Sequence, residues 1–133
     1  MKGDKSMNTC EYCNLKFDDQ KLVLENEHCL FLMLKQPDIE GSGIIIPRKH
    51  RETVFDLTEQ ECISTNALLK EVKGHIDMEY KPDGYNVGWN CGSVGGQHVF
   101  HAHLHVIPRY ADELYAGKGI RNWFKSKENR RNS

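Results

Sequence analysis

The sequence lacks the long hydrophobic run that a membrane span requires. Its longest uninterrupted apolar stretch, CLFLML at residues 29–34, falls far short of the roughly 20 residues needed to cross a bilayer. The first ten residues, MKGDKSMNTC, contain no apolar segment of the kind that directs secretion. We therefore expect a cytoplasmic protein that does not bind membranes.

The chain also lacks an excess of charge of either sign. It has 18 Lys and Arg against 19 Asp and Glu in 133 residues, a formal net charge of −1. Such a balance gives no electrostatic basis for binding duplex nucleic acid or an anionic membrane. The length fits one domain, so we expect a single domain over residues 1–133. Its core is expected at about residues 10–110, followed by a polar C-terminal extension over 111–133.

Cysteine is present, but in an arrangement that argues against a disulfide framework. The chain has five cysteines, an odd number, and Cys10 and Cys13 form a C-x-x-C pair. Such a set suits a reducing compartment and metal binding better than paired disulfides. The pair supplies half of a four-coordinate zinc site, which needs two further ligands. A thioredoxin-like redox motif, which requires a βαβ setting, and two incidental cysteines are the alternatives.

Hydrophobic patterning predicts an α+β domain. One long helix is expected over residues 58–80, because Thr58 and Glu61 match a capping box and apolar residues then recur at helical spacing. Short runs of β-branched and apolar residues predict five strands, over residues 21–26, 28–34, 44–46, 85–90 and 99–107. The order β-β-β-α-β-β indicates an antiparallel sheet covered by a helix.

Four of the seven histidines lie within residues 98–105. In a strand, the rings of His101, His103 and His105 would share one face, and the apolar residues between them would point into the core. The alternatives are the polar face of an ordinary strand and a zinc centre bound by all three rings. Alternate residues lie about 6.6–6.8 Å apart along a strand, so one ion can take two of these rings but hardly three. At least one ring therefore has another role.

A glycine-rich loop, GSVGGQ at residues 92–97, directly precedes these histidines. Glycines let backbone N–H groups approach an anion closely, which favours a phosphate site beside candidate nucleophiles. Asn90 and Gln97 offer side-chain donors to a phosphate or a ribose, with polar packing within the loop as the alternative.

The segment GGQHVFHAHLHVIP at residues 95–108 closely resembles the signature of the histidine triad, or HIT, superfamily. The resemblance extends over about residues 10–110 and includes the stretch IIIPRKH ahead of the helix. It implies a HIT-like fold, with a five-stranded antiparallel sheet, one long helix and a short second helix. It also implies a nucleotide-binding hydrolase or transferase that forms a homodimer.

Carried over by position, the resemblance makes His103 the nucleophile and places His105 against the phosphate. Asn90 and the loop amides near Gly96 would hold the remaining phosphate oxygens, together with any donor from Gln97. A neutral imidazole is a good nucleophile near pH 7, because its ordinary pKa is about 6.5. Attack on the α-phosphorus would give a covalent nucleotidyl-histidine, which divides one difficult step into two easier ones.

The chain departs from the family pattern at two positions. A further histidine that the family commonly has before the third strand is matched by Gly43, and His98 stands where serine or threonine is more usual. We hypothesise that His98 partly replaces the missing group, either by hydrogen-bonding the phosphate or by protonating the leaving oxygen.

The C-x-x-C pair resembles that of the zinc-bearing, bacterial-type branch of the superfamily. The resemblance implies one structural zinc ion bound by Cys10, Cys13, His50 and His101. A closed four-ligand site leaves no open position, so this zinc is assigned to stability and not to chemistry. A surface role for His50 at the start of a helix is the alternative.

The expected substrates, by resemblance, are dinucleoside polyphosphates or adenosine phosphoramidates. The base is expected against the early strands, where Phe31, Leu32 and Leu34 are candidates, although core packing is the commoner role of such residues. Two other functions remain open: a nucleotide-binding module with little turnover that acts through partners, and a hydrolase in which zinc activates water.

Overall fold

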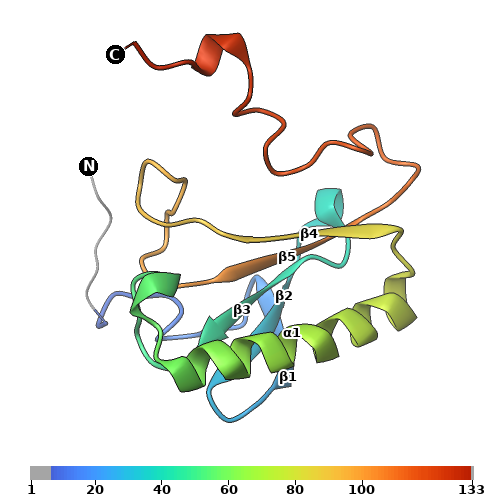
Figure 1. The fold of residues 1–133 in the computed structure, drawn as a ribbon. Coiled ribbons are helices and arrows are strands. Elements are labelled where there is room, and N and C mark those ends of the chain that lie inside the picture. Colours follow the sequence, from blue (N-terminus) through green and yellow to red (C-terminus); the bar gives the residue numbers. More distant parts are fainter. Residues whose placement is uncertain (1–6, 133) are drawn as a thin grey trace.

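The computed structural model describes residues 7–132 and shows one five-stranded sheet with a long helix on one face (Figure 1). The elements in chain order are β1 (Gln20–Glu25), β2 (Cys29–Leu34), β3 (Gly43–Pro47), α1 (Glu59–Tyr80), β4 (Gly84–Trp89) and β5 (Leu104–Arg109). The strand order is β1-β2-β3-β5-β4, and every neighbouring pair is antiparallel. The predicted α+β class is confirmed.

Three short 3₁₀ helices accompany α1 within the described residues: η1 (Pro37–Ile39), η2 (Val54–Asp56) and η3 (Lys127–Asn129). The helical turn η2 precedes α1 and has its own capping box between Thr53 and Asp56. Of the helices that the structure describes, none has the length and hydropathy of a membrane span.

The long helix begins and ends where its sequence predicts. The Thr58 side chain accepts a hydrogen bond from the Glu61 amide, and the Glu61 carboxylate accepts one from the Thr58 amide, which completes the capping box. The helix ends at Tyr80, and the C-cap residue Lys81 adopts the left-handed conformation directly before Pro82. One stripe is fully buried and faces the sheet; it consists of Thr65, Leu68, Val72 and Ile76.

The sheet has an apolar core on each face. The larger core lies under α1 and includes Phe31, Ile45, Leu104 and Val106. On the opposite face, which we call the helix-free face, Leu32, Ile44 and Ile46 form a second cluster covered in part by the N-terminal segment. The triplet of isoleucines in β3 is therefore buried on both faces, as its β-branched run predicts.

The last strand begins at Leu104, so its expected start near residue 99 is wrong. Pairing between β3 and β5 ends at Ile45 opposite Leu104. Before that point the Ala102 amide donates to the carbonyl of Arg51, at 2.7 Å, and not to a neighbouring strand. The alternation of faces holds from Leu104 onwards, and His105, paired with Ile44, lies on the helix-free face.

Candidate functional site

Two cysteines and two histidines meet at the N-terminal end of β5. The ligand atoms of Cys10, Cys13, His50 and His101 all lie within 4.8 Å of one another. The Cys13 Sγ is 3.2 Å from the His50 Nδ1 and 3.5 Å from the His101 Nδ1, and the Cys10 Sγ is also 3.5 Å from the latter. The structure thus brings together the four residues that the resemblance implies as metal ligands.

This cluster fits a zinc ion chemically. Two thiolates and two imidazoles form one of the common tetrahedral sets of structural zinc sites. The Nε2 of His101 donates to the carbonyl of Pro47 at 2.8 Å, which leaves Nδ1, the atom facing the cysteines, with its lone pair available. When bound, the ion would link the N-terminal segment to the sheet.

His103 is oriented as a nucleophile requires. Its Nδ1 lies 2.8 Å from the carbonyl oxygen of His101. Because a carbonyl can only accept, Nδ1 carries the proton and Nε2 carries the lone pair. Burial lowers the pKa of His103, although its hydrogen bond to His101 and the nearby Glu11 charge act in the opposite direction. The ring is therefore neutral at pH 7.

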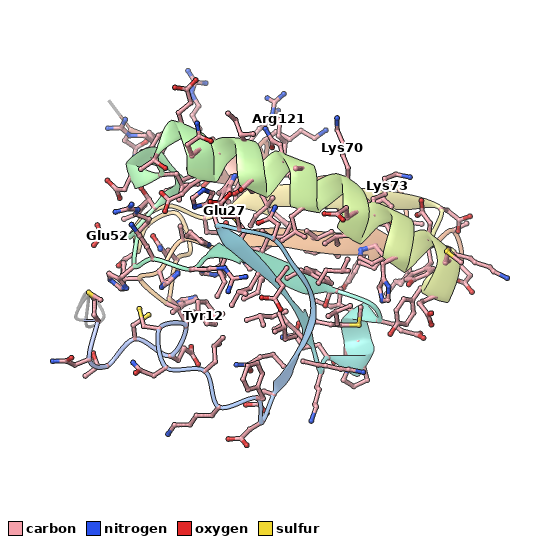
Figure 2. The ribbon with its side chains drawn as sticks, turned by 90° about the horizontal axis from the view of Figure 1, so that it is seen from below. Tyr12, Glu27, Glu52, Lys70, Lys73 and Arg121 are labelled. Atoms are coloured by element: carbon pink, nitrogen blue, oxygen red, sulfur yellow. The ribbon has the colours of Figure 1, made fainter. Side chains whose placement is uncertain are left out.

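The ring of His103 is held between two other rings. Its centroid is 4.8 Å from that of His105 and 5.3 Å from that of Tyr12, both in edge-on arrangements. Figure 2 shows Tyr12 across the sheet from α1, in the segment that contains the C-x-x-C pair. Burial raises the pKa of Tyr12 to about 12, so the phenol stays protonated.

His105 has a buried ring nitrogen without a partner among residues 7–132. Its Nε2 is one of two such side-chain atoms in this part of the chain. Burial, and then the neighbouring His103, lower the pKa of His105. A buried polar atom without a partner is costly, so its persistence beside His103 is consistent with a ligand that binds there.

The glycine-rich loop is a tight turn held by its own backbone. The amides of Gly95, Gly96 and Gln97 donate to carbonyls within residues 92–93, at 3.0–3.1 Å. Gly96 has φ +95°, and a Cβ there would lie 3.6 Å from the side-chain nitrogen Nδ2 of Asn90. The side chain of Asn90 therefore lies against Gly96, where a phosphate is expected. The loop amides form the hydrogen bonds of the turn itself.

Gln97 is fully buried and its amide group is engaged inside the protein. Its Nε2 donates to the carbonyls of Glu52 and Val99, and its oxygen accepts from the Gly92 amide. This side chain ties the loop to the segment that follows β3. His98, the next residue, is exposed.

The candidate residues for the base divide between the two faces of the sheet. Phe31 packs under α1 in the larger core, so it is unable to reach the helix-free face. Leu32 and Leu34 belong to the cluster on the helix-free face, where His105 also lies.

Arg109 ties the C-terminal extension to the sheet. Its guanidinium binds the Glu113 carboxylate and the carbonyls of Tyr115 and Lys118, and it also donates to Asn86 in β4. All these partners belong to the chain itself, so Arg109 acts as an anchor.

Sequence reasoning did not find two features of the site. Tyr12 is one of the two inner residues of the C-x-x-C pair, and nothing in the spacing indicates that its ring contacts His103. Arg51 and the buried Glu61 form a partly buried ion pair, with 2.9 Å between Arg51 Nε and Glu61 Oε1. Ten residues separate them, across an irregular segment that has no periodicity to interpret.

Fold and site together define a class: a small α+β protein whose helix-free sheet face carries a neutral, oriented histidine beside a glycine loop and a Cys/His cluster. The chain belongs to the HIT domain family, which matches residues 16–112.

Proteins similar to this chain come from organisms that are only distantly related to one another. A HIT-like protein of Mycoplasma genitalium is 34% identical over 72% of this chain; the match spans 65% of that relative, just under two thirds of its length. The adenosine 5'-monophosphoramidase hnt1 of Schizosaccharomyces pombe is 30% identical over 84% of this chain and 82% of its own. A crystal structure of a zinc-bound histidine triad family protein from Mycobacterium smegmatis has a TM-score of 0.69 and 25% identity, covering 82% and 81% of the two chains.

Proposed function

We propose that this protein is a nucleotide phosphohydrolase or nucleotidyl transferase that cleaves at the α-phosphate through a covalent intermediate on His103. Family membership and a relative named as an adenosine monophosphoramidase support nucleotide hydrolase or transferase activity in general. The observation that carries the covalent step is the hydrogen bond from the His103 Nδ1 to the His101 carbonyl, because it leaves Nε2 as the nucleophilic atom.

The reaction proceeds in two displacements. The lone pair of His103 Nε2 attacks the α-phosphorus, the bond from phosphorus to the leaving group breaks, and the leaving group takes up a proton from His98 or from solvent. Water then attacks the same phosphorus, the N–P bond breaks, and the proton lost by the water returns to that donor or to solvent, which releases a nucleoside monophosphate and restores the neutral imidazole. A nucleotidyl acceptor in place of water gives transfer.

The surrounding side chains stabilise the charge that develops on the phosphate. His105, whose Nε2 lacks a partner within the described chain, binds a phosphate oxygen. The side chain of Asn90, which lies beside Gly96, holds the remaining oxygens, and Gln97 fixes the shape of the loop. His98, exposed directly after the loop, contacts the leaving group.

The Cys/His cluster is proposed to hold a structural zinc ion, as in the zinc-bearing branch of the family. The proposed substrates are dinucleoside polyphosphates and adenosine phosphoramidates. The proposed assembly is a homodimer, which light scattering during gel filtration tests directly.

The deciding experiment compares the wild-type protein with His103→Ala on diadenosine tetraphosphate and on adenosine 5'-phosphoramidate. We expect the wild type to release AMP, the variant to fall to background, and acid-quenched wild type to carry an adenylyl group on His103 in mass spectra. Nucleotide binding without AMP release would instead identify a binding module.

Two further measurements in the same assay separate the remaining alternatives. Activity that survives metal removal in a still-folded protein excludes a hydrolase that uses zinc-activated water. A His98→Ala variant with unchanged turnover on every substrate would remove the role proposed for His98.

A further inference from the structure

Both halves of the proposed site attach to residues 47–52, the last residue of β3 and the five residues after it, which we call the connecting segment. Its carbonyls accept three hydrogen bonds from the site. Pro47 accepts from the His101 ring at 2.8 Å, Arg51 from the Ala102 amide at 2.7 Å, and Glu52 from the Gln97 side chain at 2.7 Å. The histidines and the glycine loop therefore share one support.

One peptide unit connects this support to His103. The peptide between residues 101 and 102 donates through its N–H to the Arg51 carbonyl, and its C=O accepts from the His103 Nδ1. In a trans peptide these two groups point in opposite directions within one plane. The position of the Arg51 carbonyl therefore fixes the direction of the acceptor that sets the tautomer and tilt of the His103 ring.

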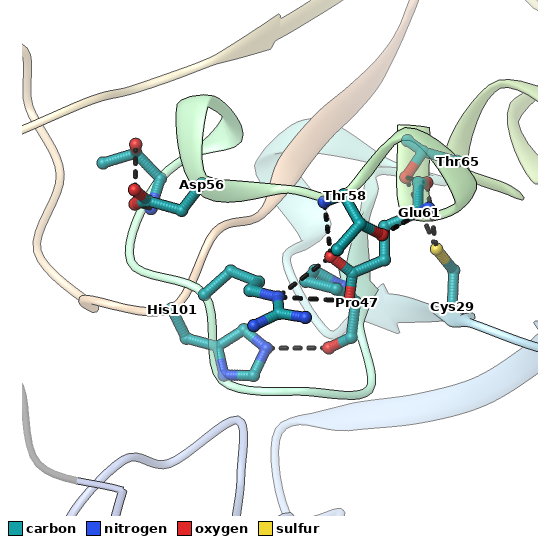
Figure 3. A network of polar contacts seen from close by, with 9 residues as sticks. Cys29, Pro47, Asp56, Thr58, Glu61, Thr65 and His101 are labelled. Carbon is teal, nitrogen blue, oxygen red and sulfur yellow. Dashed lines mark hydrogen bonds and ion pairs between the residues drawn. The ribbon is translucent and has the colours of Figure 1, made fainter. Parts of the chain in front are cut away.

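A partly buried ion pair holds Arg51 in place. Its Nε donates to both carboxylate oxygens of Glu61, at 2.9 and 3.2 Å. Glu61 is only 3% exposed, and it also caps α1 through the Thr58 amide at 2.8 Å. Figure 3 shows Glu61 and Thr58 joined by dashed contacts at the start of the helix, and a separate dashed contact between His101 and Pro47.

We infer that Arg51 and Glu61 are positioning residues for the reaction on His103. They join the N-terminus of α1 to the peptide that orients His103, and they act through that peptide and not on the substrate. The inference rests on the proposed function. Since misplacing reacting groups by about 1 Å can cost roughly 100-fold in rate, loosening this pair lowers kcat about 10- to 100-fold with little change in KM.

The chain offers a matched control in the same segment. Arg48 also forms an ion pair, with 2.6 Å between its Nη2 and the Glu25 carboxylate, but both side chains are about half exposed. An Arg48→Met variant removes an arginine and an ion pair without disturbing the peptide that binds His103. Its kcat should match that of the wild type.

The test measures kcat and KM for AMP release in Arg51→Met, Arg51→Lys, Glu61→Gln and Arg48→Met, with folding checked by circular dichroism. We expect a loss of kcat in Arg51→Met and Glu61→Gln, with partial recovery in Arg51→Lys, which keeps the charge. Should Arg51→Met not fold, the milder Arg51→Lys and Glu61→Gln decide. Folded variants with the kcat of Arg48→Met would overturn the inference.

A second readout does not depend on activity. Nitrogen-15 NMR of the imidazoles reports the tautomer of His103, which we expect to be the Nδ1–H form in wild type and Arg48→Met and a mixture in Arg51→Met and Glu61→Gln. An unchanged tautomer in all variants counts against the inference. If the wild-type protein shows no His103-dependent release of AMP, the proposed function is refuted but the positioning inference is not. The tautomer measurement then still tests whether Arg51 and Glu61 orient His103.

Discussion

At the scale of single residues, Glu61 serves two roles with one carboxylate. It caps the first turn of α1 and binds Arg51 while almost fully buried. Burial alone would raise the pKa of Glu61, but the hydrogen bonds from Arg51 and Thr58 and the Arg51 charge outweigh it, so the pKa lies below its ordinary value. The ionised form is thus the one that the fold requires.

A pH dependence of stability follows. Because folding lowers the pKa of Glu61, its contribution is complete above the ordinary value of 4.5 and is lost as the pH falls through the lower folded value. We expect Glu61→Gln to cost roughly 1–3 kcal/mol of unfolding free energy at pH 7. The gap to wild type should narrow below about pH 4.5. Urea unfolding of both proteins from pH 7 to pH 3 measures it, and a gap that stays constant contradicts the prediction.

At the scale of elements, the sequence predicted the helix and the strands but not the conformation of the segments that connect them. The capping box of Thr58 and the apolar stripe located α1, and the isoleucines located β3, because periodicity and burial reflect local physics. The start of β5 was not predictable, since the Ala102 amide can donate either to a neighbouring strand or to the carbonyl of Arg51, as it does here. Such a choice depends on residues far away in the sequence.

The site was predictable to the same extent. The cysteine pair and the histidine spacing indicated candidate site residues, and the structure brings the four proposed ligands together. Gln97 shows the limit of prediction from sequence. A side-chain amide beside a glycine loop can either bind a ligand or hold the loop in place, and only the hydrogen bonds to Glu52 and Gly92 show that Gln97 holds the loop.

These hydrogen bonds of Gln97 lead to a prediction about the flexibility of the glycine-rich loop. Gln97→Met keeps the size of the side chain but removes its three hydrogen bonds, so the loop over residues 92–97 should loosen. We expect faster hydrogen exchange at the loop amides and weaker AMP binding, with exchange in α1 unchanged. A control, Asn66→Met on the exposed side of α1, should alter neither loop exchange nor AMP affinity. Loop exchange equal to wild type would show that Gln97 does not hold the loop.

At the scale of the whole molecule, the N-terminal segment joins the sheet through the Cys/His cluster and through Tyr12. The same segment places the Tyr12 ring against His103, on the face opposite α1. The proposed metal site and the contact with the proposed nucleophile therefore lie on one short segment of the chain.

Removal of zinc tests this link. We expect a chelator to lower the melting temperature and to expose residues 7–19 to proteolysis, because the proposed ion holds this segment on the sheet. Cys13→Ser should behave like the chelated protein, whereas Cys62→Ser, on an exposed cysteine outside the cluster, should behave like wild type. Metal analysis that finds no zinc in the purified protein, together with an unchanged melting temperature, would dismiss the structural ion.

Gly43, where the family commonly has a histidine, has no room for a side chain. A Cβ there would lie 2.5 Å from the Phe31 ring and 2.6 Å from the carbonyl oxygen of Leu32. A histidine at position 43 would therefore require both the Phe31 ring and the backbone of Leu32 to move. Any side chain larger than that of glycine is expected to disturb the pairing of β2 with β3 at this point.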